Sequence, residues 1–339
     1  MPSWTARPRP YGRTWPGRSA GVNEFDLIAQ FFTRAPRRPE IVLGVGDDAA
    51  LLAPEPGTHL VVSTDTLIEG VHFAAGAPAF DVGYKALAVN VSDLAAMAAR
   101  PIGFLLNLTL PQADAAWLGG FRDGLFALAD SLDVDLIGGD TVRGPLAVTI
   151  TAWGASPAGT AVRRSGARPG DRIYVSGRLG EAALGFLSRS GAITLSAEAR
   201  DAVRARLDRP APRLHEGLAL RGLASAMIDI SDGLVADLGH ILEASAVGAE
   251  VDLHRLPLSD TYKGAFATLG YDPAIGFGDD YELCFTVPPD RGDALAGMAS
   301  QFACGFHDIG EIVAAPGLIL RDGGKIYTAG RGGYDHFRS

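Results

Sequence analysis

Short apolar runs alternate along this chain with longer segments of helical periodicity. Runs of this length that are rich in leucine or β-branched residues are typical of β-strands. The predicted strands are His59–Thr64, Ile102–Leu110, Asp133–Ile137, Leu146–Trp153, Arg172–Ser176 and Ala226–Ile230. The predicted helices cover residues 81–99, 112–131, 179–190, 196–207 and 232–245, the first with Asp81 as its N-cap. The alternation predicts an α/β (α+β) fold.

The length of 339 residues favours two or three domains. Residues 155–171 are rich in Gly, Ala, Ser, Pro and Arg, and they predict a boundary between an N-terminal domain, 21–158, and a C-terminal domain, 159–339. Residues 1–20 contain four arginines, several prolines and no acid, so we expect a flexible basic tail. They lack the apolar core of a secretory signal.

Composition excludes two classes of partner. The net charge of −9 argues against a nucleic-acid-binding surface, which is normally basic. No apolar stretch is long enough to span a bilayer, so we expect no membrane partner. Two cysteines, Cys284 and Cys304, cannot form a disulfide framework, which suits a reducing cytoplasm.

The acidic residues cluster with glycine, serine and threonine where apolar runs end. Magnesium takes oxygen ligands, commonly one or two carboxylates completed by waters and substrate phosphates. Loops that converge on such ions would clamp phosphates during phosphoryl transfer. The clusters are Gly46-Asp47-Asp48, Ser63-Thr64-Asp65-Thr66, Ser92-Asp93, Gly138-Gly139-Asp140, Asp229-Ile230-Ser231-Asp232-Gly233 and Gly278-Asp279-Asp280. Together they predict a site for several metal ions that hold phosphates.

Each cluster alone has a simpler interpretation, because aspartate and glycine are ordinary turn residues. Asp93 is different because it lies inside a predicted helix, where aspartate is a poor helix former. It shares a helix face with Asn90 and Lys85, and its neighbours Leu94 and Met97 indicate a mostly buried helix. A partly buried aspartate needs a partner, and a metal ion is a candidate.

The familiar phosphate-binding motifs are absent from the sequence. It has no Walker A motif, no dinucleotide-binding G-x-G-x-x-G and no zinc-ligand spacing. Its three lysines are Lys85, Lys263 and Lys325. Metal ions, backbone N–H groups and arginines would therefore have to neutralise the phosphate charge. Arg163-Arg164 is the candidate cationic pair, and a solvated basic turn is the alternative.

Eight segments closely resemble the thiamine-monophosphate kinase family, in its order and spacing, over about residues 22–337. They are GVGDDAALL (44–52), VVSTDTLIEGVHF (61–73), YKALAVNVSDLAAMAARP (84–101), LIGGDTVRGP (136–145), RSGARPGD (164–171), IDISDGLVADLGHI (228–241), GDDYELCFTV (278–287) and GYDHF (333–337). The resemblance implies a two-domain aminoimidazole ribonucleotide synthetase-like fold and a homodimer whose N-terminal sheets pair into a barrel. It implies ATP and several Mg²⁺ ions, with the γ-phosphoryl of ATP transferred to thiamine monophosphate to give thiamine diphosphate.

The resemblance also assigns roles by position. The magnesium positions are Asp48, Ser63, Thr64, Asp65, Asp93, Asp140, Asp229 and Asp232. The ATP positions are Gly139, Asp140, Arg164 and Ser231, and the substrate positions are His72, Asp279 and Arg331. Two of these depart from the family pattern: Asp279 stands where glutamate is common, and Arg331 where some members have an aromatic residue. We expect catalysis by metal clamping, without a covalent or acid–base residue.

Three other functions share these features. A superfamily relative acting on another substrate, such as a ribonucleotide synthetase, would keep the aspartates. A non-catalytic nucleotide-binding regulator would have no need of intact acidic clusters. A metal-dependent phosphatase would release inorganic phosphate without ATP.

Overall fold

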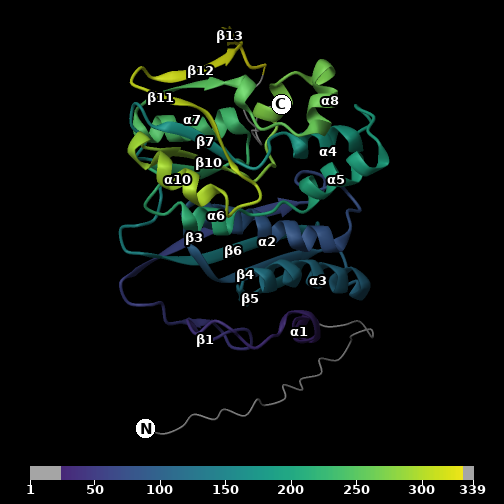
Figure 1. The fold of residues 1–339 in the computed structure, drawn as a ribbon. Helices are drawn as coiled ribbons and strands as arrows, with labels where there is room; N and C mark the ends of the chain where they lie inside the picture. Colours follow the sequence, from purple (N-terminus) through teal and green to yellow (C-terminus); the bar gives the residue numbers. More distant parts are fainter. Residues whose placement is uncertain (1–23, 331–339) are drawn as a thin grey trace.

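The computed structural model describes residues 24–330, which form a four-stranded and a seven-stranded β-sheet with helices packed on them, and a separate two-stranded sheet (Figure 1). The predicted basic tail of residues 1–20, Arg331 and the GYDHF segment lie outside the described residues. Within the described range no helix is both long and apolar enough to cross a membrane.

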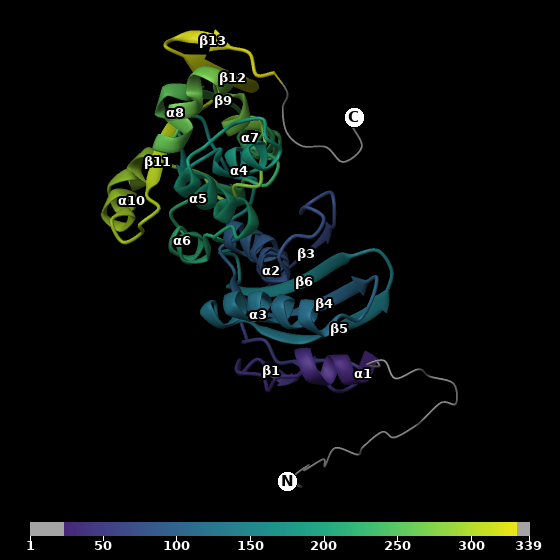
Figure 2. The same ribbon diagram turned by 90° about the vertical axis from the view of Figure 1, so that its right-hand side faces the viewer.

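The N-terminal sheet has four strands in the order β3-β6-β4-β5. β6 is antiparallel to both of its neighbours, and β4 and β5 are parallel. Two helices, α2 and α3, pack against each other on one face of this sheet (Figure 2). The bounds are β3 (Thr58–Ile68), α2 (Ala79–Ala96), β4 (Arg100–Leu110), α3 (Ala115–Ser131), β5 (Asp135–Arg143) and β6 (Ala147–Pro157).

Side chains of β3 alternate between the two faces of the sheet, as period-2 geometry requires. Val61 and Leu67 pack in the core under α2. Leu60, Val62 and Ile68 point away from the helices and are exposed. Ser63 and Asp65 therefore lie on the helix face of β3, whereas Thr64 lies on the open face.

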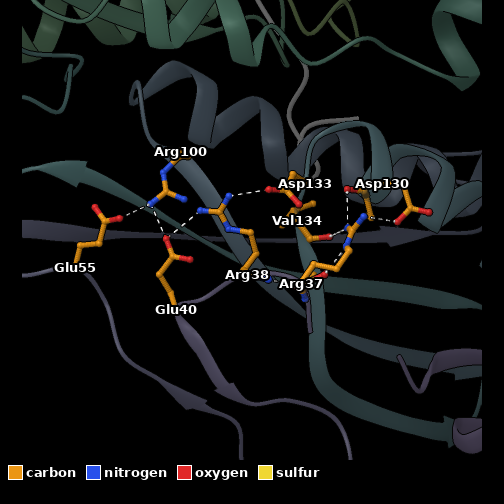
Figure 3. A network of polar contacts seen from close by, with 10 residues as sticks. Arg37, Arg38, Glu40, Glu55, Arg100, Asp130, Asp133 and Val134 are labelled. Atoms are coloured by element: carbon orange, nitrogen blue, oxygen red, sulfur yellow. Dashed lines mark hydrogen bonds and ion pairs between the residues drawn. The ribbon is translucent and has the colours of Figure 1, made fainter. Parts of the chain in front are cut away.

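The segment before β3 is fastened to the N-terminal sheet by a network of arginines and acids. It contains α1 (Glu24–Leu27), the π-helix η1 (Ile28–Phe32), β1 (Ile41–Leu43) and β2 (Leu51–Leu52). Glu40, 4% exposed, accepts hydrogen bonds from Arg38 at 2.9 Å and Arg100 at 2.6 Å (Figure 3). Arg37 bonds Asp135 through its Nε at 3.0 Å. These charges hold the β1–β2 hairpin against the sheet.

The C-terminal sheet has seven strands in the order β13-β12-β9-β11-β7-β10-β8. Its strands are β7 (Arg172–Ser176), β8 (Ala226–Asp229), β9 (Gly248–Asp252), β10 (Leu283–Val287), β11 (Phe306–Val313), β12 (Gly317–Asp322) and β13 (Lys325–Tyr327). Its helices are α4 (Glu181–Arg189), α5 (Ala197–Asp208), α6 (Leu214–Ala219), α7 (Leu234–Ser245), α8 (Asp260–Leu269), α9 (Asp272–Gly276) and α10 (Gly292–Ala299), with the 3₁₀ turns η2 (Leu253–Arg255) and η3 (Pro289–Arg291).

Helix α2 belongs to both halves of the molecule. It lies on the N-terminal sheet and also contacts β8 and α6, so that one apolar core runs from Leu106 through Leu94 to Phe285. Thirteen of its eighteen residues are buried, which confirms the prediction of a mostly buried helix. The prediction of Asp81 as N-cap is wrong: the helix begins at Ala79, and Asp81 lies in its first turn, 3.4 Å from Arg209.

Candidate active site

Helix α2 brings acids from the two halves of the chain together. Its Asp93 accepts a hydrogen bond from Ser63 Oγ on β3. The preceding residue, Ser92, donates to Asp229 Oδ2 at the end of β8, at 2.7 Å. One turn earlier, Asn90 Oδ1 accepts the N–H of Asp65 at 3.1 Å. Strand β3, helix α2 and strand β8 thus meet at one cluster of aspartates.

The pKa values of the aspartates in this cluster are raised, so their carboxyl groups are harder to ionise than usual. The pKa of Asp65 is raised to about 6, and burial is the largest cause. The charge and hydrogen bond of Asp93, and then the charge of Asp232, add to the shift. Burial also raises the pKa of Asp93, although Ser63 and Arg164 oppose the shift. The pKa of Asp229, only 4% exposed, is raised well above its usual range by burial and by Asp93. Asp65, Asp93, Asp229 and Asp232 therefore form one interacting group, which we call the acidic cluster.

The loop after β8 places Asp232 beside this group. Asp237, in the first turn of α7, accepts the N–H groups of Asp232 and Gly233, both at 3.0 Å. Burial, and then the charge of Asp232, raises the pKa of Asp237 to about 7. The carboxylate of Asp237 therefore holds the main chain of this loop, and its charge and that of Asp232 act on each other.

A second loop, residues 278–281, packs backbone to backbone on the first. The N–H of Asp279 donates to the carbonyl of Ser231 at 2.8 Å. Gly278 has φ +84°, and a Cβ atom there would lie 2.2 Å from the same carbonyl, so glycine is required at this position. Asp279 and Tyr281 also have positive φ, +60° and +49°. Backbone strain of this kind persists only where the surroundings hold it, and it concentrates at functional sites.

The two predicted substrate residues that lie in the described range converge on Lys85. Lys85 Nζ donates to Asp279 Oδ2 at 2.9 Å and to the main-chain oxygen of His72 at 3.3 Å. The Nδ1 atom of His72 accepts the N–H of Ile68 at 3.0 Å, so the neutral imidazole carries its proton on Nε2. His72 and Asp279 are thereby brought to one side of α2.

Three predicted residues lie on the open face of the N-terminal sheet or at its far edge. Thr64 Oγ1 donates to the carbonyl of Ile150 at 3.0 Å, on the face opposite Asp65. Asp140 on β5 pairs with Asn107 on β4, which pairs with Thr149 on β6, which in turn pairs with Thr66 on β3. Residues that pair directly across strands share a face of the sheet, so Asp140 lies on the open face with Thr66. β5 and β3 are opposite edges of the sheet, about 14 Å apart at the usual strand spacing. The structure therefore does not bring Thr64, Gly139 or Asp140 into the acidic cluster of one chain.

Asp48 also lies apart from the cluster. It is exposed in the turn between β1 and β2, where its N–H donates to the side chain of Asp47 at 2.8 Å. Arg164 is exposed, but its charge acts on Asp93, and the neighbouring Arg163 carbonyl accepts the N–H of Met227 on β8. The segment that carries Arg164 thus runs beside the strand that carries Asp229.

The donor set of the cluster fits magnesium. Its side-chain donors are carboxylate and hydroxyl oxygens, without the thiolate and imidazole nitrogen that zinc prefers. Within residues 24–330, no three His, Cys, Asp or Glu side chains already form a metal cage. Magnesium needs no such cage, because it keeps several waters and uses substrate phosphates as ligands. The raised pKa values reflect repulsion and burial that a divalent cation would relieve.

The sequence-based prediction names Ser92 and Lys85 beside Asp93 without assigning them a role in the site, and it assigns no role to Asp237 or Tyr281. Ser92 and Asp237 bond Asp229 and the Asp232 loop, and their long-range or loop contacts leave no sequence signal beyond proximity to the motifs. Lys85 did have a signal, because a lysine at a buried position of a chain with three lysines is unusual. Burial, and then the charges of Asp279, Asp229 and Asp65, raise the pKa of Tyr281 well above its usual range.

Comparisons with known proteins agree with this architecture. Residues 46–156 match the family model of the AIR synthase related protein N-terminal domain, and residues 168–323 match that of the C-terminal domain. The thiamine-monophosphate kinase of Salmonella typhimurium is 48% identical over 321 residues, which cover 93% of this chain and 98% of the relative. That of Bacillus subtilis is 34% identical, over 94% of this chain and all of the relative.

Solved structures of similar proteins have the same fold. The thiamine-monophosphate kinase of Stenotrophomonas maltophilia superposes with a TM-score of 0.79 at 48% identity, covering 84% of this chain and 92% of that one. AaThiL complexed with AMPPCP and TMP gives a TM-score of 0.75 at 30% identity, covering 86% and 92%. The hydrogenase maturation protein HypE of E. coli, at 21% identity and a TM-score of 0.72, covers 87% of this chain and 91% of that one and shares the fold alone. The two-domain AIR synthase-like architecture is thereby confirmed.

Proposed function

The chain belongs to the thiamine-monophosphate kinase family of AIR synthase related proteins, and from that premise we propose that it transfers the γ-phosphoryl group of ATP to thiamine monophosphate, giving thiamine diphosphate and ADP. The observation that carries the proposal is the convergence of Asp65, Asp93 and Asp229, from two halves of the chain, in one acidic cluster. A 30% identical relative that binds AMPPCP together with TMP supports both substrates.

Magnesium ions bound at the acidic cluster would neutralise the charge that develops on the transferring phosphoryl group. In the proposed site, Asp65, Asp93, Asp229 and Asp232 hold the ions, and Ser63 keeps Asp93 in place by its hydrogen bond. Asp229 is buried and the other three carboxylates are partly buried, which lowers the local dielectric constant and strengthens their effect. No covalent or acid–base residue is needed, since the acceptor phosphate oxygen is already a nucleophile at neutral pH. The chain contributes positioning and fixed charge.

The remaining predicted ligands are proposed with narrower roles. Thr64 directs its side chain to the open face, away from the acidic cluster. Arg164 and Ser231, on segments beside β8, are proposed to contact ATP. Asp48, Gly139 and Asp140 are proposed to act at the open face of the N-terminal sheet, where the second copy of the chain would also lie.

The proposed homodimer accounts for that open face. Leu60, Val62 and Val142 are 46, 56 and 50% exposed on the same side of the N-terminal sheet, and exposed apolar surface of this kind marks interaction sites. Packing two such faces together would form the predicted barrel and cover these side chains. Sedimentation of the purified protein at several concentrations tests this, and a monomer at all of them contradicts it.

The decisive experiment is turnover of the purified protein with ATP, Mg²⁺ and thiamine monophosphate, followed as ADP and thiamine diphosphate. Thiamine and aminoimidazole ribonucleotide precursors serve as control substrates, and activity with the latter alone indicates a ribonucleotide synthetase-like relative. Binding of ATP without turnover indicates a regulator. Phosphate release without ATP indicates a phosphatase.

A further inference from the structure

A buried ion pair connects the two halves of the molecule at this site. Lys85 lies in the second turn of α2, and its side chain is only 3% exposed. Its ammonium group contacts Asp279 of the C-terminal half at 2.9 Å and the His72 carbonyl at 3.3 Å. An ammonium has three N–H donors, and the rest of the described chain supplies no third partner for this one. A ligand oxygen that reached the small exposed part of this side chain would complete the three.

The carboxylate of Asp279 is fixed in place rather than free to follow the lysine. Its backbone has φ +60° and its N–H is bonded to Ser231. Its side chain is 28% exposed, so the ion pair has one buried member and one that reaches the solvent-accessible side of the site. Asp279 also acts on Tyr281, whose pKa is raised by burial and then by the charges of Asp279, Asp229 and Asp65.

The proposed acceptor has the complementary charges. Thiamine monophosphate carries a fixed positive charge on its thiazolium ring and a negative phosphate two carbons away. Resting on the proposed function, we propose that Lys85 and Asp279 select this zwitterion: the ammonium of Lys85 binds the acceptor phosphate, and the carboxylate of Asp279 faces the thiazolium ring. Unphosphorylated thiamine gives Lys85 no partner, so the lysine stays on Asp279 and cancels its attraction for the ring.

The alternative role is a structural tie that fastens α2 to the 278–281 loop. A tie of that kind contributes to stability, but it does not distinguish phosphorylated from unphosphorylated ligands. The two roles therefore differ in one measurable ratio, which is the affinity for thiamine monophosphate divided by the affinity for thiamine.

The test measures both affinities by titration calorimetry at saturating Mg²⁺ and without ATP, for the wild type, Lys85→Met and Lys85→Arg. Loss of a charge-assisted hydrogen bond to the phosphate should lower the ratio at least about tenfold in Lys85→Met. Affinity for thiamine should stay the same or rise, since Asp279 is released. Lys85→Arg should keep most of the preference. A wild-type ratio in Lys85→Met overturns the proposal.

Two further variants keep the test decisive. Lys263→Met removes an exposed lysine of α8, 3.7 Å from Asp260, and should leave the ratio unchanged. If Lys85→Met does not fold, the double variant Lys85→Met/Asp279→Asn removes both charges and is measured instead; a retained preference there also overturns the proposal. Failure of the wild type to bind thiamine monophosphate contradicts the proposed function itself. Wild-type binding with an unchanged variant ratio contradicts only the role of Lys85.

Discussion

The arginine network around Glu40 and the acidic cluster around Asp65 both hold buried acids, but they satisfy them differently. Glu40 contacts two arginines, and Asp135 accepts two main-chain N–H groups and the Nε of Arg37 (Figure 3). In the acidic cluster, Asp93 and Asp229 accept hydrogen bonds from serine hydroxyls and lie among other acids. One group is balanced by cations of the chain, and the other depends mainly on neutral donors.

This difference distinguishes buried acids that stabilise the fold from buried acids that bind a ligand. A buried acid that is matched by arginines stabilises the fold around it, as Glu40 does for the hairpin before β3. A group of buried acids with raised pKa values destabilises the empty protein, and it persists where a ligand completes it. The comparison predicts that removing a charge from the two groups has opposite consequences for stability and activity.

The largest effect is expected from Asp65→Asn or Asp232→Asn. Each substitution removes one preorganised charge, and kcat should fall at least about a hundredfold. Stability of the metal-free protein should not fall, since Asp65 is already hard to ionise there. Steady-state turnover at saturating Mg²⁺, with thermal unfolding in EDTA, checks both statements. Near-normal kcat in both variants contradicts the metal-clamp mechanism.

Glu40→Gln should show the opposite pattern. It leaves Arg38, which is 12% exposed, without its buried partner, and losses of this kind cost about 3 kcal/mol. We expect a lower midpoint of urea unfolding with kcat within about twofold of wild type. An exposed pair provides the control: Arg321→Gln, whose partner Glu250 is 40% exposed, should change stability by less than about 1 kcal/mol. A large loss of activity in Glu40→Gln without unfolding would remove the distinction between the two groups.

The sequence predicts much of this architecture. Each of the six predicted strands and five predicted helices matches an observed element, with ends shifted by up to six residues, because apolar periodicity is local information. Strands β1, β2 and β9 to β13 are not predicted. Several of them are short and partly polar, and they are stabilised by pairing with distant strands, as β12 is by β9.

The composition of the acidic cluster is less predictable. Six motifs contain aspartates, but which of them meet depends on the face that each strand presents and on the order of strands in the sheet. Asp65 and Thr64 are adjacent and face opposite sides of β3, and Asp140 lies on the opposite edge strand. The bond from Ser92 to Asp229 joins residues 137 positions apart. These facts follow from tertiary structure, which a list of motifs does not contain.

Asp280 is a buried acid whose carboxylate accepts main-chain N–H groups, and its raised pKa predicts that stability depends on pH. Burial raises its pKa to about 8, although the N–H groups of Gly180 and Ala182 oppose the shift. A raised pKa means that the folded state binds the proton more tightly, so the contribution to stability is fully present only below the ordinary aspartate pKa of about 4, falls as pH rises from there, and is lost above about pH 8. Between pH 7 and 9 the loss should be about 1–2 kcal/mol. Asp280→Asn should remove most of this slope in urea unfolding, the remainder coming from Asp237; a slope equal to wild type contradicts the assignment.

The smallest effect tests the boundary of the acidic cluster at two neighbouring positions of β3. Ser63 bonds Asp93 on the helix face, and Thr64 bonds the Ile150 carbonyl on the open face. Ser63→Ala removes a hydrogen bond to a charged group, and we expect kcat to fall about tenfold. Thr64→Val keeps the shape and the main-chain oxygen, so kcat should change less than twofold, measured in the same assay at several Mg²⁺ concentrations. Equal losses in the two variants would mean that both faces of β3 serve the metal ions, and the cluster would then have to extend through the sheet to Asp140.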